Sequence, residues 1–207
     1  MFAPVVQTVV LAAAVSNGVA QSQTPLAAGA LTLNGSLVSG GVAQLTPAGS
    51  GLARQFILGF AADETGHNFL VVGTNANGNP IRETIAGTTA GTAPSVNYYQ
   101  TVTSVTISAA ATGAITAGTN GIGVSRTINL DTALNPSNTT VSIVVSGTVN
   151  YTLQWTVGDI QSSPSWNDDP VLAAQTASGG TSYAMPISGL RVLNNSGTGS
   201  VTTTVLQ

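Results

Sequence analysis

Apolar and polar residues alternate with a period of two along much of the chain, and this pattern predicts strands. In the clearest case Val149, Tyr151, Leu153, Trp155 and Val157 alternate with polar residues. Such alternation is typical of a strand with one buried face. Alternating or β-branched runs also occupy residues 31–38, 42–45, 54–60, 69–72, 81–85, 98–108, 114–118, 141–146, 187–193 and 201–206. No stretch has a convincing helical period, so the sequence indicates an all-β fold.

Residues 75–80 read Asn-Ala-Asn-Gly-Asn-Pro and separate two strand-like runs. Asn and Gly tolerate the positive φ angles of a tight reversal, and Asn77-Gly78 is a strong signal for a two-residue hairpin turn. Pro80 cannot donate to a central ladder, which favours an edge strand after the turn. Glu83 shares a face with Ile81 and Ile85, which indicates an edge position or an ion pair with Arg54 or Arg82.

Three glycines in residues 118–123 predict a linker that ends near Arg126. We therefore expect two small antiparallel β-sandwich or barrel-like domains in tandem, residues 1–122 and residues 123–207. A short internal match supports two related halves. Residues 104–107 and 112–116 match residues 189–192 and 198–202, so each half is expected to close on the same hairpin.

The apolar run at residues 5–15 has the look of a signal-peptide core, but no Lys or Arg precedes Arg54 to supply the positive flank. The run is also too short to span a bilayer. We interpret it as a strand that completes the first domain or as an arm that reaches a neighbouring subunit.

Charged residues make up 5% of the 207 residues, against roughly 25% in an ordinary soluble protein. The net charge of -3 leaves no basic surface for nucleic acid or anionic lipid, so neither is an expected partner. The 43% hydrophobic content argues against disorder. A surface of Thr, Ser and Asn is typical of β-proteins in assemblies. The absence of Cys excludes disulfides and thiolate chemistry.

Catalytic chemistry has few candidates. His67 is the only histidine, and we expect a plain surface residue beside Asp63 and Glu64. A carboxylate pair formed by folding, such as Asp63 or Glu64 with Asp159, stays open. We expect no enzyme, no cofactor and no metal, and we assign no catalytic or binding residue.

Two further groups have alternative interpretations. Asp168 and Asp169 offer oxygen ligands, but the spaced pattern of a calcium loop is missing, so we expect a solvated loop. Trp166, Tyr98 and Tyr99 would favour a glycan-binding module if they met on an exposed face, and burial in the core would exclude it. Residues 118–123 are not followed by the Lys-Ser/Thr pair that ends a phosphate-binding loop.

Several stretches resemble a family of tailed-bacteriophage virion structural proteins. They are residues 22–35, 74–84, 105–107, 119–121 and 195–202, the last of which resembles the closing hairpin of that family. The resemblance implies a particle component with no catalytic residues, located in the virion after assembly in the bacterial cytoplasm. Its partners would be the major capsid protein or other virion proteins.

Within that class we expect a capsid decoration or cement subunit that binds the assembled shell as a homo-oligomer. Edge-strand and apolar contacts, with little electrostatics, would suit the scarcity of charge. The alternatives are a neck, collar or fibre component at the head-tail junction and a glycan-binding module.

Overall fold

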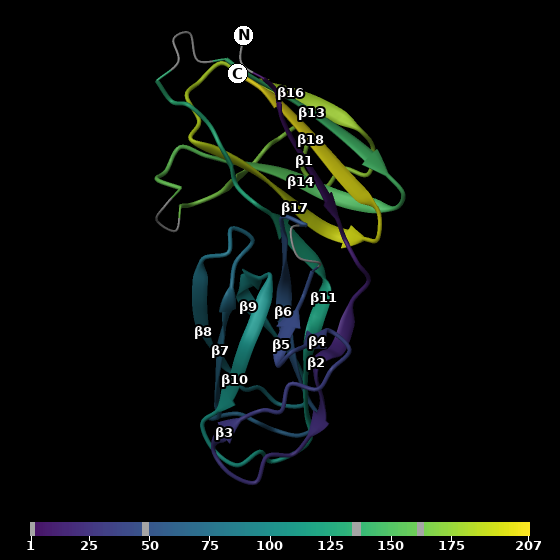
Figure 1. Cartoon of the computed structure of the whole chain (residues 1–207), viewed down its shortest axis with the longest axis vertical. Coiled ribbons are helices and arrows are strands. Elements are labelled where there is room, and N and C mark those ends of the chain that lie inside the picture. The colour runs from purple at the N-terminus through teal and green to yellow at the C-terminus, as the bar shows by residue number, and fades with distance from the viewer. Residues whose placement is uncertain (1–2, 47–49, 134–137, 161–163) are drawn as a thin grey trace. The chain divides into compact units, whose positions relative to one another are not determined.

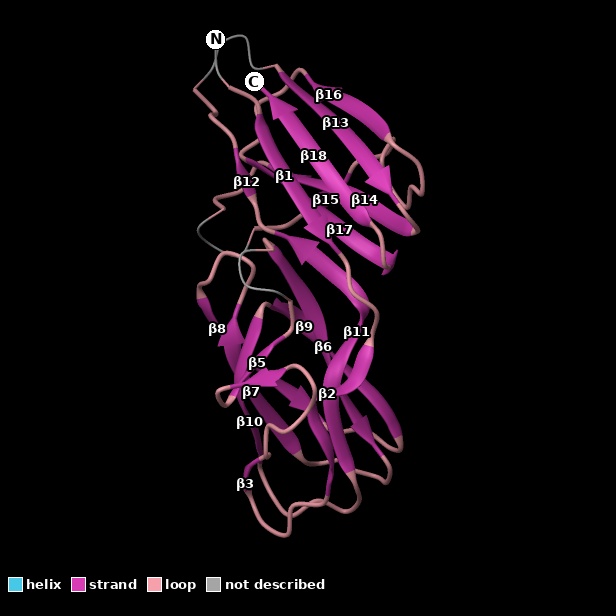
Figure 2. Cartoon of the chain, turned by 45° about the vertical axis from the view of Figure 1, so that its right-hand side comes forward, coloured by secondary structure: helices cyan, strands magenta, loops and turns pink. Residues whose placement is uncertain are grey.

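A computed structural model describes residues 3–46, 50–133, 138–160 and 164–207 of the chain (Figure 1). Within these ranges the chain forms strands and loops and no helix (Figure 2). The sheets are built from antiparallel pairs. The all-β, sandwich-like fold expected from the alternation is therefore confirmed.

The chain divides into two compact units. The terminal unit contains Met1–Ala12, Ser50–Leu52 and Gly123–Gln207, and the central unit contains Ala13–Gly49 and Ala53–Ile122. One division thus falls between residues 122 and 123. The simple tandem arrangement is wrong for the N-terminal segment, because β1 (Val5–Val10) pairs along its whole length with β18 (Ser200–Leu206). The first of the two expected roles, a strand that completes the first domain, is therefore wrong, because the segment completes the terminal unit.

The terminal unit has two layers of strands. One is a sheet in the order β1-β18-β13-β16, with β13 at Thr139–Ser146 and β16 at Gly179–Tyr183. The other contains β15 (Asn167–Asp168), β14 (Val149–Thr156), β17 (Gly189–Gly197) and β12 (Ile128–Asn129). Their buried side chains form one core of Val9, Leu11, Leu52, Ile128, Val141, Ile143, Val149, Tyr151, Leu153, Leu172, Tyr183, Ile187, Leu190, Val192, Val201 and Val205.

Strand β14 follows the sequence pattern closely. Val149, Tyr151 and Leu153 are buried, and Trp155 packs against the core with its ring centroid 6.3 Å from that of Tyr183. Val157 lies just past the strand and is exposed. The alternation therefore identified the face of β14 that packs on the core, but the expectation of a single buried face is wrong, because Thr152, Gln154 and Thr156 on the other face are also buried.

The central unit also has two groups of strands. One has the order β4 (Val38–Ser39), β5 (Val42–Gln44), β10 (Thr101–Ile107), β7 (Asn68–Thr74) and β8 (Pro80–Ala86), and β3 (Gly29–Ala30) also pairs with β10. The other contains β2 (Val15–Gln23), β11 (Ile115–Ser125), β6 (Leu52–Phe60) and β9 (Gly91–Tyr99). Phe56, Phe60, Phe69, Val71, Tyr99, Val105, Ile107 and Ile115 are among the core residues between them.

The predicted hairpin at residues 75–80 is present, and β8 is an edge strand of its sheet. Its loop is longer than the expected two-residue turn, because the last registered pair is Thr74 with Pro80. The Asn75 side-chain oxygen accepts from the amides of Asn77 (2.9 Å) and Asn79 (3.0 Å). Gly78 has a φ of +81°, as a reversal at this position requires.

The expected linker at residues 118–126 is wrong, because residues 115–125 form β11. One of its glycines serves close packing, because a Cβ at Gly118 would lie 2.0 Å from the carbonyl oxygen of Val15 on β2. The expected strand at residues 31–38 is also wrong except for Val38, which begins β4. There the Thr32 amide donates to the Gln23 side chain at 2.9 Å, in place of a ladder bond.

The hairpins expected to close the two halves, at residues 104–116 and 189–202, are not hairpins. Each is a connection from one sheet to another. Strands β10 and β11 do not pair with each other, and neither do β17 and β18. The amides of Thr198 and Gly199 both donate to the carbonyl of Thr148, which holds the second connection against the start of β14. The matching sequences of the two halves therefore form the same type of connection, but this connection joins strands of two different sheets.

The strand expected at residues 98–108 is divided between two strands. Strand β9 begins at Gly91 and includes Tyr98 and Tyr99, and β10 begins at Thr101. The single alternating run therefore contains the end of β9 and all of β10, which belong to different sheets.

Candidate functional site

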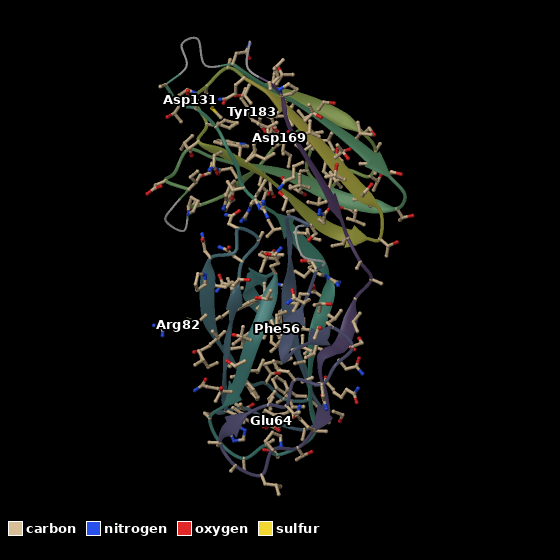
Figure 3. The ribbon with its side chains drawn as sticks, viewed as in Figure 1. Phe56, Glu64, Arg82, Asp131, Asp169 and Tyr183 are labelled. Atoms are coloured by element: carbon tan, nitrogen blue, oxygen red, sulfur yellow. The ribbon has the colours of Figure 1, made fainter. Side chains whose placement is uncertain are left out.

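Glu64 is a buried carboxylate of the central unit (Figure 3). One oxygen accepts from the amides of Thr112 (2.9 Å) and Gly113 (2.8 Å) in the β10–β11 connection. The other lies 2.6 Å from Nδ1 of His67. His67 is thus a hydrogen-bond partner of Glu64 with a side chain 22% exposed, and not the plain surface histidine that was expected. Both groups serve to fix loops.

Glu83 links the two edge strands β8 and β9. Its oxygens accept from the backbone amides of Val96 (2.7 Å) and Asn97 (2.9 Å), where β9 bulges away from β6. The edge position was expected, but the suggested ion pair with Arg54 or Arg82 was wrong. Arg82 projects away from the ribbon (Figure 3).

Asp169 is the corresponding buried carboxylate of the terminal unit. One oxygen accepts from the amides of Val171 (2.9 Å) and Leu172 (2.8 Å), and the other accepts from the Tyr183 hydroxyl at 2.6 Å. Burial raises the pKa of Tyr183, and the neighbouring Asp169 raises it further. The expected solvated loop is therefore wrong for Asp169, although Asp168 beside it is exposed.

Arg54 is a buried cation in the central unit. Its guanidinium donates to the carbonyls of Ala13 (3.0 Å) and Asn120 (2.6 Å), while its Nε has no hydrogen-bond partner within the described residues. Burial lowers the pKa of Arg54, because desolvation disfavours the charged form. The side chain ties the start of the unit to β11.

Each of these charged groups makes hydrogen bonds to the backbone. Glu83 directs both oxygens to backbone amides. Glu64 and Asp169 each direct one oxygen to backbone amides and the other to a side chain, His67 and Tyr183 respectively. Across the described ranges no group of three or more His, Cys, Asp or Glu could hold a metal ion. No helix in those ranges is long and apolar enough to cross a membrane.

Trp166 lies in a polar network on the terminal unit. The Arg191 guanidinium sits 4.2 Å from the Trp166 ring centroid, and Arg191 Nε donates to Gln154 at 2.8 Å. Gln154 in turn donates to Asp168 at 2.8 Å. The Arg191 guanidinium thus covers one face of the Trp166 ring. A sugar cannot stack on that face while the guanidinium occupies it.

The other two aromatic candidates lie in the central unit. Tyr99 is fully buried and contacts Phe56 edge to face, with ring centroids 6.1 Å apart. Burial raises the pKa of Tyr99, as does the charge of Glu83, against a smaller lowering by Asn97. Because Tyr99 is a core residue, the exposed aromatic face that would have favoured glycan binding loses one of its three members.

The strongest candidate for a functional surface is the outer face of the sheet β1-β18-β13-β16. Val9, Val141, Ile143, Val201 and Val205 point into the core, so alternation places the residues between them outside. We define the outer face as Val6, Thr8, Val10, Thr140, Ser142, Val144, Ser146, Gly180, Ser182, Ser200, Thr202, Thr204 and Leu206.

None of the four strands contains a charged residue. Cross-strand pairing sets Thr8 beside Thr202 and Thr202 beside Val144, and the two threonine hydroxyls lie 2.9 Å apart. Val6, Val10 and Val144 are 56–59% exposed. The sequence showed separate uncharged runs, but only the register brings them together as one face.

A scan against protein-family models matches no family, and searches of curated proteins and of solved structures find no match. The surface just described therefore carries the functional argument together with the sequence resemblance.

Proposed function

We propose that this chain is a non-enzymatic structural component of a tailed-bacteriophage virion, a capsid decoration subunit that binds the assembled shell. The observation that carries the proposal is the uncharged outer face with its exposed valines. The resemblance of residues 22–35, 74–84 and 195–202 to virion structural proteins supports the same class.

An uncharged face suits a permanent contact with another protein. Burying Val6, Val10 and Val144 removes apolar area from water at about 25 cal/mol per Å². The hydroxyls of Thr8, Thr202 and neighbouring residues supply hydrogen bonds at no desolvation cost for a charge. The affinity of such a contact depends weakly on salt, because no ion pair is screened.

The fate of the acidic residues supports a structural role. Glu64, Glu83 and Asp169 hold loops and strand edges through backbone amides. These three acids are thus held by the fold and are not directed at a substrate.

Co-sedimentation with purified shells that lack the protein tests the proposal. Val144→Lys places a charge in the outer face, and Val96→Lys makes the same change at an exposed valine of the central unit. We expect Val144→Lys to weaken binding at least about tenfold, an effect of about 1.4 kcal/mol, and Val96→Lys to leave it unchanged. Equal binding by both variants, or none by the wild type, would contradict the proposal.

A further inference from the structure

Strand β1 is an edge strand of unusual regularity. It pairs with β18 in an unbroken register from Val5 opposite Val205 to Val10 opposite Ser200, with no bulge. Among the described residues β18 is its only strand partner. Its other side therefore presents a straight row of backbone donors and acceptors.

Other sheet edges of the chain carry features that oppose pairing with another chain. Strand β8 begins at Pro80 and carries Arg82, β9 contains Pro94 and a bulge, and β4 and β15 are two residues long. Strand β16 begins with two glycines. Charges, prolines, bulges and short strands are the usual protection of edges, and β1, with the sequence Val-Val-Gln-Thr-Val-Val, has none of them.

The residues that face the free edge follow from the ladder. Leu11 donates its amide to the carbonyl of Gly199, in continuation of the β1–β18 register. Hydrogen-bonded pairs alternate along an antiparallel ladder, so the odd residues of β1 bond to β18. The N–H and C=O groups of Val6, Thr8 and Val10 therefore point to the free edge.

We propose that β1 pairs antiparallel with β1 of a second copy of this chain, around a two-fold axis at Thr8. Thr8 then lies opposite Thr8 of the second copy, and Val6 lies opposite its Val10. Each such pair exchanges two backbone hydrogen bonds. The outer faces of the two copies join into one continuous surface, and no charge meets a like charge at the axis.

The chain itself selects this register. A shift of two residues in one direction sets Pro4, which has no N–H, opposite Val10. A shift in the other direction sets Val6 opposite Ala12, which lies past the end of the strand. The register centred on Thr8 alone uses all three outward residues of β1. Such a pairing has two-fold symmetry, which is the commonest symmetry of homo-oligomers.

This pairing goes beyond the proposed function, because it is a property of the purified chain whether or not a shell is present. It also brings two outer faces together in a single bound species.

A cysteine cross-link tests the register directly, since the chain has no cysteine of its own. Cα atoms of a hydrogen-bonded antiparallel pair lie about 5.5 Å apart, within the range that a disulfide spans. We expect Thr8→Cys to form a disulfide-linked dimer of twice 20.5 kDa on mild oxidation. The control Thr202→Cys lies one strand further from the axis on each side and should stay uncross-linked.

A proline variant tests the backbone bonds. The Thr8 N–H points away from β18, so Thr8→Pro keeps the β1–β18 ladder and removes donors at the axis. We expect sedimentation to show a dimer for the wild type and a folded monomer for Thr8→Pro, with Thr8→Lys as a second disrupting variant and Thr202→Lys remaining a dimer. A monomeric wild type at about 100 μM, a dimer unaffected by Thr8→Lys, or equal cross-linking of both cysteine variants would overturn the proposal.

Discussion

The Tyr183 hydroxyl donates to the buried carboxylate of Asp169 at 2.6 Å, and this bond joins β16 to the loop that follows β15. Both residues lie inside the terminal unit (Figure 3). The same carboxylate also orders the turn at Val171 and Leu172. The pair therefore stabilises one side of the sandwich that presents the outer face.

Removing this hydrogen bond should destabilise the protein. Tyr183→Phe deletes a bond to a charged acceptor, which is worth about 1.5–3 kcal/mol. Tyr151→Phe is the control, because its hydroxyl donates to the neutral carbonyl of Ala177 at 3.1 Å and should cost about 1 kcal/mol. Urea unfolding gives both free energies, and a Tyr183→Phe effect no larger than that of Tyr151→Phe would contradict the assigned role.

Stability should fall in alkaline solution. Burial raises the pKa of Tyr99, Tyr151 and Tyr183 above the usual tyrosine pKa of about 10. Above that pH the unfolded chain loses these protons while the folded chain keeps them, so unfolding becomes more favourable. The stabilising effect is complete below about pH 10 and is lost as the pH rises.

The absence of lysine makes this dependence easy to attribute, because tyrosines are the main groups that titrate in the window. Urea midpoints measured between about pH 8 and about pH 11 should fall at the alkaline end. Tyr99→Phe should make the decrease shallower. A constant or rising midpoint would contradict the burial of these hydroxyls.

Two neighbouring acids, Glu64 and Asp63, should differ sharply in how much they contribute to the stability of the folded protein. Glu64→Gln replaces an acceptor of two backbone amides and of His67, and we expect a loss of about 2–4 kcal/mol. Asp63 is exposed, and its pKa is lowered chiefly by hydrogen bonds with Thr65. Asp63→Asn should therefore leave the unfolding midpoint nearly unchanged. Similar effects of the two variants would show that Glu64 does not hold the loops as described.

Replacing two neighbouring asparagines should change the stability of the protein in opposite directions. The side chain of Asn194 is buried, and neither of its polar atoms has a hydrogen-bond partner in the part of the chain that the structure describes. Asn194→Val should therefore stabilise the protein by about 1 kcal/mol. Asn195 donates to Asn150 (2.7 Å) and Thr152 (3.0 Å), so Asn195→Val should destabilise it. Thermal melting of the two variants decides between these signs.

The sequence predicted local structure better than strand partners. Alternation along β14 identified its buried face, and Asn77-Gly78 identified the β7–β8 hairpin, because both signals depend on neighbouring residues. The position of β1 could not be predicted in this way. Its pattern shows that it is a strand, but its partner β18 is almost the full length of the chain away.

The candidate site was less predictable for the same reason. Glu64 and Asp169 look like surface acids in the sequence, because the backbone amides that bind them carry no side-chain signal. The outer face depends on register among β1, β18 and β13, which separate uncharged runs do not specify.

The copy number of this protein in purified virus particles, relative to the major shell protein, tests the central claim most directly. Quantitative mass spectrometry of intact particles gives that ratio, and the symmetry of the particle makes it discriminating. A capsid decoration subunit should be present in numbers comparable with the shell protein. A small multiple of the tail symmetry would move it to the neck or fibres, and its absence from the particles would contradict a virion role.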